Sequence, residues 1–202
     1  GLHFIQTQVW YDGLAQDVHE ATAQWSVIVL LITVLAMENR RRGLVFGASS
    51  TWVEGAGPFL RRYHGYFFAW AAIYTFWYHP MEDTWGHLFG FFYMFLLMLQ
   101  GSLFLPRAHV NRKWTVVLEV TFAFHGAMVA YLAGQGWQMF LMGGLAMFII
   151  TQMHGLGLSR RARWLIGSGY MAGLGLIYAG RGWRYLPEVA GIPLTLLSGV
   201  LV

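Results

Sequence analysis

The groups in this sequence that could do chemistry are mainly histidines and carboxylates inside or beside apolar stretches. Three histidines in different apolar stretches are each followed directly by glycine: His64, His125 and His154. A neutral imidazole is the usual axial ligand of haem iron. A missing side chain next to the ligand would leave room for a flat macrocycle. The pattern therefore predicts haem b, with His64 and His154 as ligands at matching depth and His125 lying deeper.

A second set of titratable residues shares one short connection, which reads HPMEDTWGH. It contains His79, Glu82, Asp83 and His87. Two imidazoles and two carboxylates can bind a metal ion, and the two histidines could instead hold a second haem. The same residues would also suit a solvated turn. The connection thus predicts a metal or haem site, with a plain turn as the alternative.

A carboxylate and an amide form the third candidate. At about 1.5 Å of rise per residue, Glu119 and Gln100 each lie about 9–10 Å along a helix from the nearest basic residue, close in depth to His154. Inserting an ionisable group into the hydrocarbon core costs about 2.5–3.5 kcal/mol, so such a group is expected to have a function or a polar partner. We expect Glu119 and Gln100 to relay protons or contact a quinone. The alternative is that these groups only form hydrogen bonds between helices.

Composition limits the kind of element that can position these groups. The 202 residues are 57% hydrophobic, 17% aromatic and 11% charged, with no cysteine. A soluble domain has about 25% charged residues, so the composition argues against a soluble enzyme and a disordered chain. The absence of cysteine excludes disulfide modules, thiolate-ligated haem and iron–sulfur clusters. The remaining class is a polytopic membrane protein.

Apolar stretches predict an all-α membrane bundle in a single domain, residues 1–202. A crossing helix needs about 20 mostly apolar residues. The predicted spans are 21–37, 59–78, 85–105, 114–133, 137–156 and 164–179, and a seventh would begin near 189. Residues 1–20 are expected to form an outer interfacial segment. Because the chain begins at Gly1 and ends within an apolar stretch, we expect it to be processed or incomplete at one or both ends.

The distribution of basic residues predicts the orientation of this bundle. Of the 13 Lys and Arg residues, 11 fall between alternate spans, and only Arg181 and Arg184 fall on the other side. Basic residues mark the cytoplasmic side, so the N-terminus is expected outside. We expect the protein to lie in a bacterial inner membrane or its organellar equivalent. The 11 are Arg40, Arg41, Arg42, Arg61, Arg62, Arg107, Arg112, Lys113, Arg160, Arg161 and Arg163.

Two functions follow from these patterns. The first is a membrane redox subunit that binds haem b or a quinone and moves electrons or protons across the bilayer. The second is a non-catalytic accessory subunit of a larger respiratory or photosynthetic complex, packing lipids or pigments. In both, the expected partners are membrane lipids and other membrane subunits, and no nucleic acid.

Overall fold

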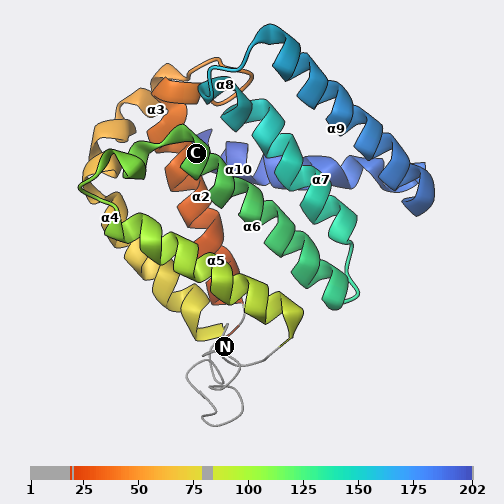
Figure 1. The fold of residues 1–202 in the computed structure, drawn as a ribbon, viewed down its shortest axis with the longest axis horizontal. Coiled ribbons are helices and arrows are strands. Elements are labelled where there is room, and N and C mark those ends of the chain that lie inside the picture. Colours follow the sequence, from red (N-terminus) through yellow and green to blue (C-terminus); the bar gives the residue numbers. More distant parts are fainter. Residues whose placement is uncertain (1–18, 20, 79–83, 202) are drawn as a thin grey trace.

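The computed structural model describes residues 19, 21–78 and 84–201, and this part of the chain is all-helical (Figure 1). The longer helices begin close to where the apolar stretches of the sequence begin. The elements are α2 (Ala21–Arg42), α3 (Thr51–Glu54), α4 (Ala56–Tyr78), α5 (Trp85–Ser102), η3 (Arg107–Val110), α6 (Arg112–Leu132), α7 (Trp137–Met147), η4 (Phe148–Gln152), α8 (Met153–Gly155), α9 (Arg160–Arg181), η5 (Trp183–Ala190) and α10 (Gly191–Leu201).

Polar side chains cap the starts of three helices. Asn111 accepts hydrogen bonds from the backbone N–H groups of Lys113 and Trp114, at 2.9 and 3.2 Å, and so begins α6. Thr84 and Ser159 cap α5 and α9 in the same way. A capping oxygen satisfies an N–H group that has no partner inside the helix. Local sequence therefore decides where these helices begin.

The helices pack around two apolar clusters that meet at α7. The first joins α2, α7 and α10 through Leu35, Met147 and Leu196. The second joins α7, α9 and η5, and its main members are Met142, Ala146, Tyr178 and Val189. Helices α2 and α4 pack side by side, as do α6 and α7. Helix α9 lies along the outer edge of the bundle (Figure 1).

Glycine allows a close helix contact in the bundle core. A Cβ atom added at Gly144 of α7 would lie 2.7 Å from the Cβ of Ala123 on α6. Real Cβ atoms do not approach so closely, so the two backbones can meet only because Gly144 has no side chain. This contact positions α6 beside the turn that follows α7.

The prediction of six or seven membrane spans is wrong by this structure. Among the described residues, only α6 is long and apolar enough to cross a membrane, with a mean hydropathy of 1.5. One such helix is weak evidence for a transmembrane protein, so the membrane and transmembrane assignments lose most of their support.

The helices differ from the predicted spans for a physical reason. Helix α2 continues through its charged end to Arg42, and α4 includes Arg61 and Arg62. A π-helical turn at 148–152 lies between α7 and α8, so the stretch 137–155 is helical but irregular. Helix α10, at the place of the expected seventh span, has 11 residues. At 1.5 Å per residue, 11 residues are too short to cross a bilayer.

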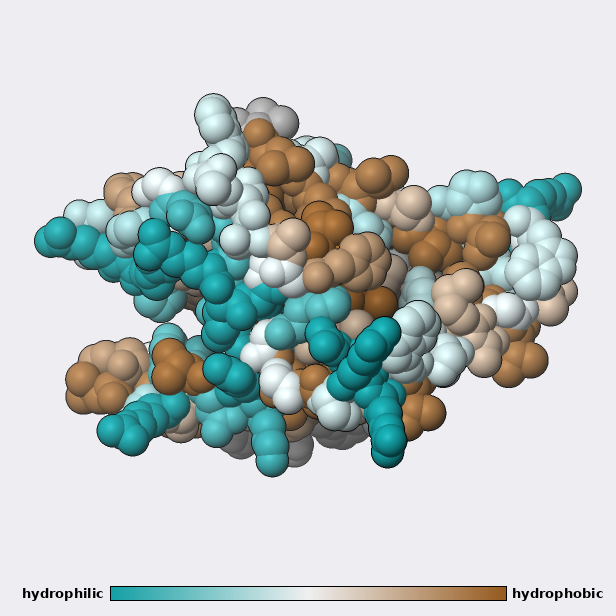
Figure 2. Space-filling model, turned by 90° about the horizontal axis from the view of Figure 1, so that it is seen from above, coloured by the Kyte–Doolittle hydropathy of each residue, from teal (hydrophilic) through white to brown (hydrophobic). Residues whose placement is uncertain are grey.

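One end of the molecule collects most of the basic residues. The C-terminal end of α2 and the N-terminal ends of α4, α6 and α9 meet there, in the upper part of Figure 1. Figure 2 looks down on this end and shows hydrophilic side chains gathered over it, with apolar side chains beside them. We call this face, which carries Arg40, Arg62, Arg112, Lys113 and Arg160, the basic end.

Candidate functional site

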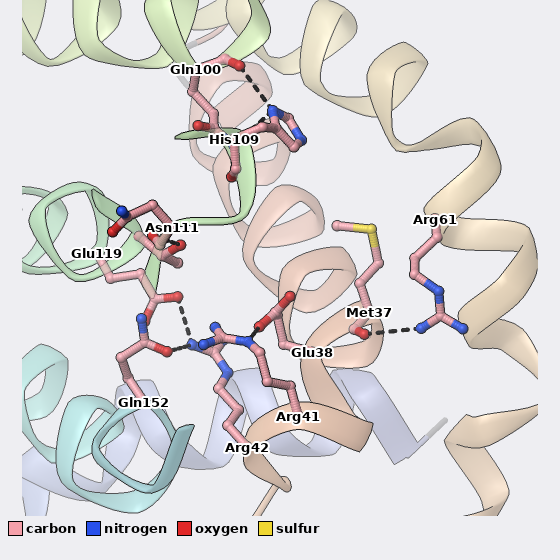
Figure 3. A network of polar contacts seen from close by, with 11 residues as sticks. Met37, Glu38, Arg41, Arg42, Arg61, Gln100, His109, Asn111, Glu119 and Gln152 are labelled. Carbon is pink, nitrogen blue, oxygen red and sulfur yellow. Dashed lines mark hydrogen bonds and ion pairs between the residues drawn. The ribbon is translucent and has the colours of Figure 1, made fainter. Parts of the chain in front are cut away.

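Arg42 is the centre of the main polar cluster inside the helices (Figure 3). Its Nη1 atom donates to Glu119 Oε1 of α6 at 2.6 Å, and also to Gln152 Oε1 of the π turn. The Arg42 side chain is 1% exposed and that of Glu119 is 22% exposed. A buried charge needs a partner of opposite sign. Arg42 therefore ties together α2, α6 and η4.

The π turn explains how Gln152 reaches this cluster. A π turn is wider than an α-turn and shifts the side chains that follow it around the helix. Thr151 and Gln152 are both buried there, and Thr151 donates to the backbone carbonyl of Met147 at 2.8 Å. Such turns often occur at functional sites.

A small cavity lies beside this cluster. Its volume is about 50 Å³, and its polar lining comes from Arg42, Glu119 and Thr151, with apolar residues of α2, α6, α7, η4 and α10 forming the rest. Two buried donors of the cluster, Arg42 Nε and Gln152 Nε2, find no hydrogen-bond partner within the described part of the chain. A cavity of this volume can hold a water molecule. It is far smaller than the roughly 300–1,000 Å³ that larger ligands occupy.

The surroundings of His154 correct the haem prediction. A Cβ added at Gly155 would lie 2.8 Å from the Cβ of Arg42, so the space expected for a macrocycle is filled by α2. The His154 Nε2 atom lies 3.2 Å from the carbonyl oxygen of Ile149, and its ring packs edge-on against Phe46. His154 thus packs against Phe46 in the loop that follows α2.

His64 lies in a different environment, on α4. Its Nδ1 atom is 2.7 Å from the carbonyl oxygen of Arg61, and its ring centroid is 5.8 Å from that of His109. Gln100 bonds to the same neighbour, because its Nε2 donates to the His109 carbonyl at 3.1 Å. The Gln100 Oε1 atom accepts from the indole of Trp114 at 2.6 Å. Gln100 therefore joins α5 to the start of α6, and the structure gives it and Glu119 separate sets of partners.

His125 packs against aromatic rings of α5. Its ring centroid lies 6.0 Å from Phe89 and 6.3 Å from Tyr93. The three Gly-flanked histidines thus have three different sets of neighbours. None of them lines the small cavity beside Arg42, and the haem and quinone predictions find no support in the described part of the chain.

The metal prediction at 79–87 can be followed only in part. His79, Glu82 and Asp83 lie outside the described residues. The Nδ1 atom of His87 is 2.8 Å from the hydroxyl of Thr84, the residue that caps α5. Over residues 21–78 and 84–201, no group of three or more His, Asp or Glu could hold a metal ion. The described part of the chain therefore gives metal binding no support, and the site at 79–87, with three of its four residues outside that part, stays a prediction.

A second polar cluster lies at the opposite end from the basic residues. Arg181 Nη2 donates to Glu188 Oε2 at 2.8 Å, and Tyr178 donates to Glu188 Oε1 at 2.7 Å. Arg181 Nη1 also donates to Gln138 at 2.9 Å, which ties α9 to α7. Burial raises the pKa of Glu188, but the hydrogen bonds from Arg181 and Tyr178 outweigh it and hold that pKa below its ordinary value.

Sequence reasoning missed two residues of these clusters. It takes Arg42 as one of a basic run that marks orientation, and it does not single out His109. No local pattern separates Arg42 from Arg40 and Arg41, since only its direction from the end of α2 buries it. Comparison of the chain with protein-family models, curated proteins and solved structures finds no match. Function must therefore be argued from the geometry alone.

Proposed function

We propose that this chain is a non-catalytic helical subunit of a larger membrane-associated assembly. Its exposed apolar helix faces are covered there by helices of partner subunits and by lipid. The alternative that the sequence left open, an accessory subunit, is thereby preferred to a redox subunit.

The observation that carries the proposal is the amount of apolar side chain left exposed. Large apolar residues point outward along four long helices. In α6, the one described helix that is both long and apolar enough to cross a membrane, only 22% of the most apolar stretch is buried. Contiguous exposed apolar surface of this kind marks an interaction site. Those most exposed on the long helices include Tyr66, Ile73, Phe92, Phe95, Met98, Phe124, Leu165, Met171 and Leu176.

The interior polar groups support a structural role. Arg42, Glu119 and Gln152 bond to one another, and Gln100 bonds to His109 and Trp114. Groups with these partners set how helices pack against one another. An accessory subunit needs such a rigid frame and no reactive centre.

Helix α9 provides a surface suited to a partner helix. A Cβ added at Gly167, Gly169, Gly173 or Gly175 would meet nothing within 4 Å. Small residues spaced along one helix allow the backbone of another helix to approach closely. Because α9 lies at the edge of the bundle, its side that carries Gly169 and Gly173, one turn apart, is open to a second chain.

Paired substitutions on α5 test the proposal. Phe95 and Ser102 are both exposed, and Ser102 lies at the last turn of the helix. Phe95→Asp places a charge on the apolar face. We expect it to release the chain from the membrane fraction and from any larger complex seen on a native gel. Ser102→Asp should leave both unchanged.

Circular dichroism in a neutral detergent would show that both variants keep their helices. If wild-type chain expressed in cells is recovered as a water-soluble monomer, the proposal is wrong. Equal behaviour of Phe95→Asp and wild type would also overturn it.

A further inference from the structure

A surface hollow at the basic end lies between the start of α6 and the turn that leads to α9. Its volume is about 580 Å³. Its polar lining comes from Asn111, Arg112 and Lys113 at the start of α6, and the rest of its lining is apolar. A Cβ added at Gly157 would lie 3.6 Å from Nη1 of Arg112, so the guanidinium reaches across to the turn before α9.

The two cations of this hollow have no carboxylate partner among the described residues. The described carboxylates near this end are each paired with an arginine of α2: Glu38 with Arg41, Glu54 with Arg40, and Glu119 with Arg42. Arg112 and Lys113 are exposed and enter no described ion pair. The hollow is therefore positively charged and suits an anion.

The apolar lining is made of Val116, one turn after Arg112 on α6, and of Leu156 and Leu158 on the turn before α9. These side chains would be a poor surface for a free inorganic ion, because they offer it no hydrogen bond. They suit a hydrocarbon chain attached to the charged group. Exposed apolar residues continue around the same end, and Phe104, Leu105 and Val110 are each at least 70% exposed.

We propose that this hollow binds an anionic phospholipid. The phosphate is held by Arg112 and Lys113, and the start of an acyl chain lies along Val116, Leu156 and Leu158. Basic pockets between helices at the cytoplasmic surface recognise such headgroups. The inference rests on the proposed membrane setting, and it adds the class of lipid and the residues that select it.

Lipid titration of the full chain in neutral detergent micelles tests this inference directly. Phosphatidylglycerol and phosphatidylcholine are added in turn, and native mass spectrometry measures the fraction of protein that carries one lipid. We expect clearly tighter binding of phosphatidylglycerol. Each Lys or Arg near an anionic headgroup is worth about fivefold in affinity. The ratio of phosphatidylglycerol affinity to phosphatidylcholine affinity should thus fall by about 25-fold in the double variant Arg112→Gln/Lys113→Gln.

Three further samples complete the test. Arg184→Gln, which removes an exposed charge at the other end, should keep the preference. Leu158→Gln should weaken binding of both lipids. Inorganic phosphate at the concentration of the bound lipid should not compete.

Equal binding of the two lipids would overturn the inference. Undiminished preference in the double variant, or full competition by phosphate, would overturn it too. The micelle assay needs neither a bilayer nor a partner subunit. A failure here is therefore distinct from a failure of the proposed assembly, which the α5 variants test.

Discussion

Arg42 shows how one residue can join distant parts of the chain. Its guanidinium bonds to Glu119 and Gln152, which lie 77 and 110 positions away in the sequence. Charged groups buried in this way contribute little net stability when paired, but removing one partner leaves the other uncompensated. The folding free energy lost when Arg42 is substituted is therefore mainly the cost of burying a carboxylate that has lost its partner.

We expect Arg42→Met to lower the free energy of unfolding by about 3 kcal/mol. This is near the low end for a broken buried pair, because Glu119 keeps some exposure to solvent. Chemical denaturation in detergent would measure it. Arg40→Met is the matched control, since Arg40 is exposed and lies 3.8 Å from Glu54. Its cost should stay below about 1 kcal/mol, and equal costs would contradict the role of Arg42.

Glu188 makes folding depend on pH. Its pKa in the folded chain lies below the unfolded value of about 4.3. The stability it contributes is thus fully present above that unfolded value, and is lost as pH falls through the lower folded pKa. Melting temperatures measured between pH 7 and pH 3 should fall less steeply for Glu188→Gln than for wild type. Glu54→Gln, at an exposed and longer ion pair, should follow the wild-type curve.

At the scale of elements, the helices differ in how completely they are covered. Helices α6 and α7 meet at Gly144, where no side chain fits, whereas the glycines of α9 face open space. The same residue type therefore does opposite things on the two helices. In α7 it permits a contact that holds the bundle, and in α9 it only weakens the helix unless a partner covers it.

Alanine substitutions separate these two uses of glycine. Gly144→Ala should destabilise the chain by about 1–3 kcal/mol, because its Cβ would clash with Ala123. Gly173→Ala should instead stabilise the isolated chain by up to about 1 kcal/mol. Thermal unfolding in detergent would measure both. Stabilisation by both variants would show that α6 and α7 are not in close contact.

At the scale of the whole molecule, polar and apolar surfaces are separated. Basic side chains gather at one end (Figure 2), while outward apolar side chains line the long helices. Burying apolar surface gains about 25 cal/mol per Å². The exposed helix faces will therefore associate with lipid, detergent or other chains rather than stay in water.

Removal of detergent should make the wild-type chain self-associate. Sedimentation velocity would show large species at detergent concentrations below the critical micelle concentration, and a single small species above it. In the double variant Phe95→Asp/Met171→Asp, which changes two exposed residues, self-association should begin only at a lower detergent concentration than in wild type. A monodisperse wild-type chain without detergent would contradict the expected covering of these faces.

The sequence alone determined the helical class and the approximate starts of the helices. Apolar stretches and capping residues such as Asn111 and Ser159 are local signals, and local hydrogen bonds decide where a helix begins. The sequence did not determine how many helices cross a membrane. The prediction counted apolar stretches, whereas the helices also took in Arg61, Arg62 and the basic end of α2, and a π turn makes the helix after α7 irregular.

Only the tertiary structure decided which polar residues meet. The sequence placed Glu119, Gln100 and His154 at a similar depth, but depth says nothing of direction around a helix. The folded chain brings Glu119 to Arg42, Gln100 to His109, and Arg42 into the space beside His154. Those contacts join residues far apart in the sequence, and they depend on helix rotation and packing, which composition and spacing do not specify.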